Sequence, residues 1–124
     1  MINETHKILG DNEIKVTATT VRVPVFHGHS ESINIEFEKP FDLDELKKVL
    51  ADAPGIIVQD DVANNVYPMA ITAEDTDEVY VGRIRRDFSV ESGVNIWCVA
   101  DNIRKGAATN TVQIAQEIIK RGLK

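Results

Sequence analysis

An arginine and two histidines close a run rich in β-branched residues near the amino terminus. The run reads TTVRVPVFHGHSE over Thr19 to Glu31 and contains Arg22, His27 and His29. A strand that carries Arg22 to a pocket, followed by a turn through Gly28, would bring His29 back towards the arginine. A guanidinium binds a carboxylate through two parallel hydrogen bonds, and an imidazole exchanges protons near neutral pH. The pattern therefore predicts an anion clamp beside a proton-transfer group.

These side chains also have ordinary structural interpretations. An arginine in a strand is more often a surface or ion-pair residue, and two histidines in a loop are more often solvated than catalytic. A metal site composed of His27, His29 and Cys98 lacks any recognised zinc spacing, so we expect no metal. Cys98 is the only cysteine and lies in the apolar run IWCV, which is typical of a buried strand and not of a reactive thiol.

Hydrophobic periodicity predicts the elements that surround this segment. Helices are expected over residues 2–9, 42–53 and 106–119, and the second begins with a capping box formed by Asp42 and Glu45. About five strands are expected, over residues 14–25, 32–38, 56–59, 79–86 and 94–99. The first two strands would form an antiparallel hairpin, with the candidate site in its loop at residues 26–31. The polar stretch 60–77 is expected to be an excursion or an interface arm.

These elements predict an α+β fold with a mixed, largely antiparallel β-sheet and helices on one face. Only two substantial helices are available to cover the sheet, so one apolar face would remain exposed and would bind a partner. The chain has 124 residues and is 43% hydrophobic, which suits a single domain over residues 1–124.

The charge balance and the cysteine content narrow the class of protein. The formal net charge of −6 argues against nucleic-acid binding, which needs a basic face. One cysteine allows no internal disulfide and favours a reducing compartment, so we expect a cytoplasmic protein. The first ten residues contain no signal-peptide pattern and no apolar run approaches about 20 residues, so we expect no membrane association.

Two segments resemble the bacterial aspartate-semialdehyde dehydrogenases. The first is TTVRVPVFHGHSE, and the second is DNIRKGAATNTVQIA at residues 101–115, which in that family leaves a strand and forms a terminal helix. Shorter matches extend the resemblance over nearly the whole chain, at residues 4–9, 53–58, 67–68 and 81–87. The resemblance implies the C-terminal substrate-binding and dimerisation domain of such an enzyme, with a fold like that of the glyceraldehyde-phosphate dehydrogenase-like enzymes. It also implies that the NADP-binding domain and the nucleophilic cysteine precede this chain, which has no G-x-G-x-x-G motif.

The resemblance assigns roles to three residues. Arg22 would bind the substrate carboxylate, His29 would be the acid/base residue, and Asn102 would contact the nicotinamide end of NADP. His27 competes for the acid/base role, but the family has the histidine that is followed directly by serine. Asp101 belongs to the same family segment, which approaches the nicotinamide end of NADP, but it is explained equally well as a residue that caps a helix.

In the intact enzyme, the resemblance implies reversible reductive dephosphorylation of aspartyl phosphate to aspartate semialdehyde and phosphate. This reaction belongs to the biosynthesis of lysine through diaminopimelate, of threonine and of methionine. The isolated chain would be inactive, because it would lack the cysteine nucleophile and the dinucleotide fold. We expect a symmetric homodimer through the exposed face of the sheet.

Two alternatives to this interpretation remain. One is a non-catalytic dimerisation or interaction module on the same scaffold, which would not require Arg22 and His29. The other is the equivalent domain of a related acyl-phosphate reductase, such as an N-acetyl-glutamyl-phosphate reductase or a glyceraldehyde-phosphate dehydrogenase.

Overall fold

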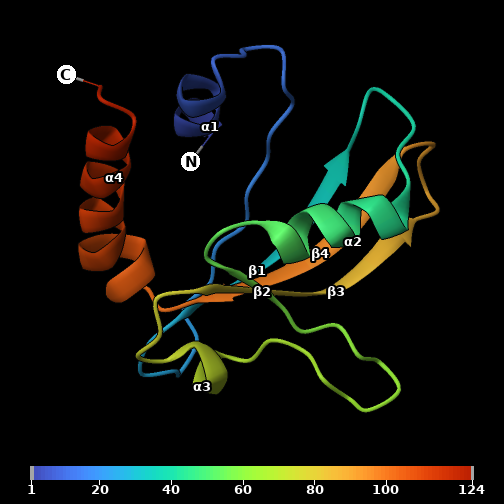
Figure 1. The fold of residues 1–124 in the computed structure, drawn as a ribbon. Coiled ribbons are helices and arrows are strands. Elements are labelled where there is room, and N and C mark those ends of the chain that lie inside the picture. The colour runs from blue at the N-terminus through green and yellow to red at the C-terminus, as the bar shows by residue number, and fades with distance from the viewer. Residues whose placement is uncertain (1, 124) are drawn as a thin grey trace.

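The computed structural model describes residues 2–123, and its centre is a four-stranded β-sheet (Figure 1). The strands lie in the order β1-β4-β3-β2, with bounds His29–Glu36 for β1, Ile56–Val58 for β2, Val79–Asp87 for β3 and Gly93–Ala100 for β4. β4 is antiparallel to β1 and to β3, whereas β2 is parallel to β3. The predicted α+β fold with a mixed, largely antiparallel sheet is therefore confirmed.

Helices precede, connect and follow these strands. Their bounds are Ile2–Leu9 for α1, Leu43–Asp52 for α2, Ala70–Ala73 for α3 and Thr109–Lys120 for α4, and a π-helix, η1, spans Arg104–Ala108. Asp42 caps α2 as predicted, since its carboxylate accepts a 2.8 Å hydrogen bond from the Glu45 N–H. In the part of the chain that the structure describes, no helix is long and apolar enough to cross a membrane.

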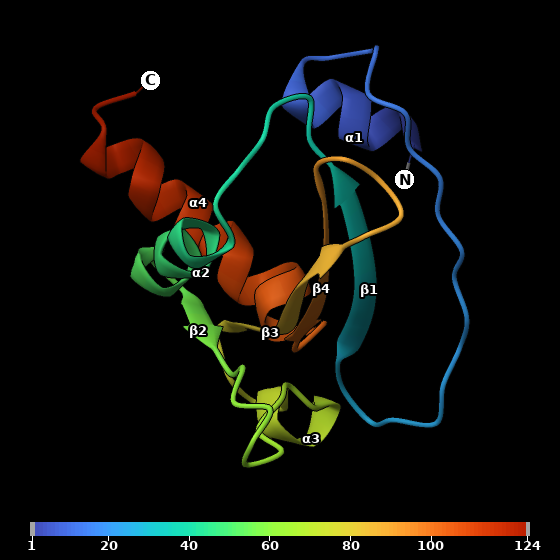
Figure 2. The same ribbon diagram turned by 90° about the vertical axis from the view of Figure 1, so that its right-hand side faces the viewer.

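The main apolar core lies between α2 and one face of the sheet (Figure 2). Three leucines of α2 pack against the buried residues of the sheet, and this set comprises Leu43, Leu46, Leu50, Val81, Ile84 and Val94. Cys98 is half-buried against the same cluster, and burial raises the pKa of its thiol to about 11. The expectation of an unreactive, structural cysteine fits this environment.

The opposite face of the sheet differs from the predicted apolar surface. On β1 it presents exposed Ser32 and Asn34, which pair with Trp97 and Asn95 of β4. The reason is the alternation in this strand, which directs its isoleucines towards the α2 side and its polar residues away. The apolar residues of this face are Trp97, Tyr80 and Val99, and the last two are buried together with Ala73 of α3. The indole Nε1 of Trp97 donates a 3.0 Å hydrogen bond to the Pro68 carbonyl.

The predicted hairpin between residues 14–25 and 32–38 was wrong. Residues 14–25 contain neither strand nor helix, and they bow away from β1 along the outside of the molecule (Figure 2). Two features explain this. Pro24 has no N–H to donate to a strand ladder. In addition, residues 29–31 of the predicted loop are already paired with residues 98–100 of β4, so they cannot form the turn that the hairpin requires.

Residues 60–77 form the excursion that the sequence predicts, with an isolated bridge between Asp61 and Val66 followed by α3. The excursion begins in close contact with β3 at Gly82. A Cβ atom added to Gly82 would lie 2.1 Å from the Gln59 carbonyl oxygen and 2.5 Å from Cδ of Pro68. Glycine is therefore required there by the close approach of the backbone.

Candidate functional site

His29 is the first residue of β1 and lies opposite Ala100, the last residue of β4. The residue is exposed. The sequence predicts His29 in a hairpin loop, whereas the structure places it on a strand whose backbone is paired with β4. The position of its Cα is therefore determined by strand register, and its side chain is available to a ligand.

Gly28, directly before His29, is bound to the segment that follows β4. Its N–H donates a 2.6 Å hydrogen bond to Oδ1 of Asn102. Gly28 has φ of +117°, a conformation that glycine adopts much more readily than other residues. An added Cβ would make only ordinary contacts, at 3.5 Å from Cβ of Ala70 and 3.6 Å from the Ala100 carbonyl oxygen. The requirement for glycine therefore comes from the backbone conformation and not from lack of space.

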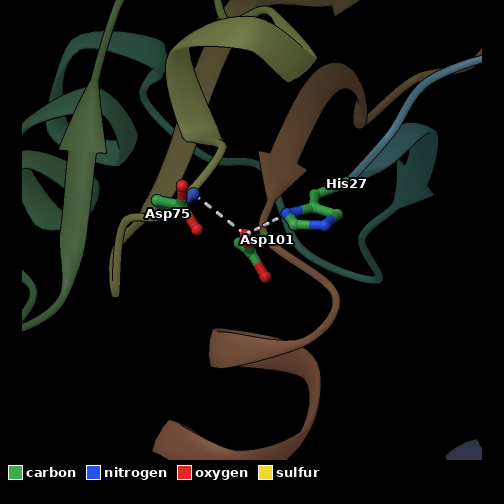
Figure 3. Close-up of side chains that lie close together, drawn as sticks. All are labelled: His27, Asp75 and Asp101. Carbon is green, nitrogen blue, oxygen red and sulfur yellow. Dashed lines mark hydrogen bonds and ion pairs between the residues drawn. The ribbon is translucent and has the colours of Figure 1, made fainter.

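Asp101 is fully buried beside this turn and joins three segments of the chain (Figure 3). Its Oδ1 accepts hydrogen bonds from the N–H groups of Ile103 and Arg104, at 2.7 and 2.8 Å, and its Oδ2 accepts one from the Asp75 N–H at 3.0 Å. The pKa of Asp101 is lowered mainly by the hydrogen bond from the Arg104 N–H, and the nearby His27 adds a smaller attraction. Its role as a helix-capping residue is thus confirmed.

His27 faces carboxylates from two other segments. Its Nδ1 lies 3.8 Å from Oδ2 of Asp101 and 3.7 Å from Oε1 of Glu74, which is too far for a hydrogen bond. Among the described residues this buried nitrogen has no hydrogen-bond partner. A protonated His27 would therefore be attracted to both carboxylates. This attraction would hold residue 27, which follows the segment 14–25, near the end of β4.

The ligand atoms of His27, Asp75 and Asp101 all lie within 4.8 Å of one another, an arrangement that a metal ion could use. This cluster differs from the set of His27, His29 and Cys98 considered from the sequence. Both carboxylate oxygens of Asp101 are already engaged by backbone N–H groups, and Asp75 is exposed. The protein contacts account for the cluster, and we assign no metal to it.

Arg22 lies on the segment 14–25, away from these contacts. It is exposed and lines a shallow depression with Thr20 and Val21. Within residues 2–123, no hydrogen bond or ion pair holds its guanidinium. The structure therefore brings Asn102 to the backbone next to His29, but it provides no contact that fixes Arg22 beside them.

Two contacts of this site carry no clear signal in the sequence. Gly28 and Asn102 are 74 residues apart, and nothing in either local pattern predicts their hydrogen bond. The proximity of His27 to Asp101 is equally non-local. The local signal is limited to an Asp-Asn pair between a strand and a helix, which predicts the cap but not its partners.

Comparison with known proteins identifies the family. Residues 1–105 match the family model described as semialdehyde dehydrogenase, dimerisation domain. The chain belongs to this family. Arg22, His29 and Asn102 all lie within the matched range. The resemblance to the C-terminal dimerisation domain of aspartate-semialdehyde dehydrogenases is thereby confirmed.

Relatives of this semialdehyde dehydrogenase dimerisation domain are considerably longer proteins. The aspartate-semialdehyde dehydrogenase of Aquifex aeolicus is 59% identical over 123 residues, which are 99% of this chain and 36% of that protein. The enzyme of the same name from Legionella pneumophila is 53% identical over 122 residues, covering 98% of this chain and 35% of that protein. The chain thus spans about a third of the length of these relatives.

Solved structures show the same fold for the dimerisation domain. Aspartate semialdehyde dehydrogenase II from Vibrio cholerae, determined in complex with ASA, superposes with a TM-score of 0.89 at 44% identity. The match covers 97% of this chain and 35% of that chain. The enzyme from Francisella tularensis is only 20% identical, and its TM-score of 0.74 shows a shared fold alone.

Proposed function

We propose that this dimerisation domain supplies the acid/base and substrate-binding residues of an NADP-dependent aspartate-semialdehyde dehydrogenase. The enzyme would interconvert aspartyl phosphate and aspartate semialdehyde in the cytoplasm, on the route to lysine, threonine and methionine. The observation that best supports this proposal is the exposed His29 at a paired strand end, next to Gly28 and Asn102, in a chain 59% identical to a relative of that name.

His29 would transfer the proton at the reacting carbonyl. Its exposure allows an imidazole nitrogen to approach a substrate, and its strand-bound backbone limits the orientations that the ring can take. The nucleophilic cysteine and the dinucleotide fold would belong to the remaining part of the enzyme. NADP, bound mainly there, would accept or donate the hydride.

Arg22 would bind the substrate and Asn102 would bind the cofactor. Arg22 would pair with the substrate carboxylate through its planar fork, which requires that the segment 14–25 be covered and ordered by the rest of the enzyme. Asn102 uses Oδ1 to accept the Gly28 N–H, which leaves its amide NH₂ group to donate to the nicotinamide carboxamide.

The domain would also form a symmetric homodimer, as the name of its family suggests. The sheet face opposite α2 has a groove of about 640 Å³ lined by Tyr67, Met69 and Trp97, with Arg83 and Arg85 beside them. Aromatic residues, methionine and arginine are enriched at protein interfaces, so this groove is the proposed contact. A monomer at high concentration in analytical ultracentrifugation would contradict the homodimer.

The catalytic proposal is tested by reconstitution. The purified chain would be mixed with the amino-terminal remainder of the Aquifex aeolicus relative, and phosphate-dependent NADP reduction would be measured with aspartate semialdehyde. We expect activity from the mixture and from neither part alone, because the thiolate, the hydride acceptor and the aldehyde must be aligned. His29→Asn should lower turnover by about 10² to 10⁴, the range typical of general acid/base catalysis.

His6→Asn is the matched control, since His6 lies on α1 and its ring contacts the Ile14 carbonyl. It should leave turnover unchanged. Demonstrated association of the two parts without any activity would instead favour a non-catalytic module. Activity that survives His29→Asn would reject the role of His29.

A further inference from the structure

The pairing of β1 with β4 is continued past the end of the strands by a side chain. His29 lies opposite Ala100, and the next contact outwards joins the Gly28 N–H to Oδ1 of Asn102 at 2.6 Å. Gly28 has φ of +117°, so its backbone has left the extended conformation and cannot continue a regular ladder. The side-chain oxygen Oδ1 of Asn102 therefore takes the place of a backbone acceptor at this position.

Asn102 is itself held by its neighbour in the sequence. The buried carboxylate of Asp101 accepts hydrogen bonds from the N–H groups of Ile103 and Arg104, so the backbone is fixed on both sides of Asn102. The same carboxylate binds the Asp75 N–H and lies 3.8 Å from Nδ1 of His27. One buried carboxylate thus holds the chain that follows β4 and lies close to the turn that precedes His29.

We propose that Asn102 is a positioning residue that orients His29 through Gly28, and that Asp101 holds Asn102 in place. The proposal rests on the acid/base role proposed for His29. It departs from the interpretation of Asn102 as a cofactor contact alone, because the contact present in the chain is made by the oxygen of the amide and ends at the backbone beside His29. A loss of this contact would free the peptide that leads into His29.

Two substitutions separate the functions of the Asn102 side chain. Asn102→Ala removes both the acceptor and the amide donor. Asn102→Asp retains an acceptor for the Gly28 N–H but removes the NH₂ group that a nicotinamide carboxamide would need. Asn12→Ala, in the exposed turn after α1, is the matched control.

The contact is tested first in the chain alone, by amide hydrogen exchange at Gly28 measured by NMR. Asn102→Ala should accelerate exchange at Gly28 by about threefold to tenfold, the effect of losing one ordinary hydrogen bond. Asn102→Asp and Asn12→Ala should leave it near the rate of the unmodified chain. Unchanged exchange at Gly28 in Asn102→Ala would overturn the proposal, even if the acid/base role of His29 were established.

Kinetics of the reconstituted enzyme then test the consequence for His29. Asn102→Ala should lower kcat, and Asn102→Asp should restore most of kcat, while KM for NADP is raised in both variants because both lack the NH₂ donor. In a His29→Asn background, Asn102→Ala should lower kcat no further, because the residue that it orients is gone. A raised KM for NADP in both variants, with unchanged kcat, would make Asn102 a cofactor contact and overturn the positioning role.

The two proposals fail in distinguishable ways. If His29→Asn has no effect on turnover, the proposed function of His29 fails, while faster Gly28 exchange in Asn102→Ala would still establish the contact. If His29→Asn abolishes turnover and Asn102→Ala lowers it equally in both backgrounds, the function stands. Asn102 would then act independently of His29, and the positioning proposal would be rejected.

Discussion

The two ends of the segment that carries the proposed site are held in different ways. At one end, His29 is paired with Ala100 and is preceded by the hydrogen bond from Gly28 to Asn102. At the other end, Arg22 lies on exposed chain outside the sheet, where the Val25 N–H donates to the Val23 carbonyl and the His6 ring contacts the Ile14 carbonyl. The backbone of His29 is thus held by this chain, whereas no contact among the described residues holds the Arg22 guanidinium.

The apolar residues around Arg22 lead to the same conclusion. Val21 is 82% exposed and Val23 is 55% exposed, although both belong to a run whose composition is typical of a strand. Burial of such side chains stabilises a protein by about 25 cal/mol for each Å² of apolar surface removed from water. In the proposed enzyme, the remaining two thirds of the protein would cover this segment and place Arg22 at the substrate.

Arg22→Lys should have the largest effect of the variants that test this comparison. It replaces a planar fork with a point charge, so one of two charge-assisted hydrogen bonds to the substrate carboxylate is lost. In the reconstituted enzyme we expect KM for aspartate semialdehyde to rise about tenfold to a hundredfold, with a smaller change in kcat. Arg121→Lys is the control, because Arg121 pairs with Glu117 on α4. A fall in kcat at unchanged KM would mean that the roles of Arg22 and His29 had been exchanged.

Gly28→Ala tests the ordered end of the segment. An alanine at φ of +117° is strained whatever space is available, so the free energy of unfolding should fall by about 1 to 3 kcal/mol. Gly106→Ala is the control, since Gly106 does not have positive φ and the nearest atom to an added Cβ lies at 3.8 Å. Urea denaturation of the chain measures both variants. An equal loss in the two variants would show that Gly28 is not specifically required.

The elements were largely predictable from the sequence because their signals are local. The capping box at Asp42 and the apolar stripe of α2 predict that helix, and alternation predicts β1, β3 and β4 to within a few residues. The run 14–25 has the same kind of signal and forms no strand. A strand needs a neighbouring segment with free N–H and C=O groups. The alternation within a strand does not indicate which segment will be that neighbour.

The candidate site was predictable only in part. Arg22 and His29 were proposed from their chemical types and from the family resemblance, and the assignment of their roles stays a prediction. The cap formed by Asp101 is readable from its place before a helix. The contact from Gly28 to Asn102 cannot be predicted from the local sequence, because it depends on β1 lying beside β4, which is a property of the folded sheet.

Acid should weaken the ordered end of the segment through Asp101. Its pKa is lowered in the folded chain by backbone N–H groups, so the unfolded chain binds the proton more readily. The stabilisation is fully present above the unfolded-chain pKa of about 3.9 and is lost as pH falls through the lower, folded pKa. The stability difference between the unmodified chain and Asp101→Asn should therefore shrink as the pH is lowered from 5. Glu38→Gln, in an exposed loop, should show no comparable trend, and a difference that stays constant with pH would refute a charged Asp101.

The smallest effects compare the two ends directly, by amide hydrogen exchange in the chain alone. The Gly28 amide donates to Asn102, whereas residues 14–25 lie outside the sheet. When each exchange rate is divided by the rate expected for an unstructured peptide, Gly28 should therefore exchange about threefold to tenfold more slowly than Val21 and Val23. Addition of the amino-terminal part should then slow exchange at Val21 and Val23 and leave Gly28 almost unchanged. Equal protection of all three amides before the addition would mean that the chain itself orders Arg22. It would also mean that the difference between the two ends is not a property of the molecule in solution.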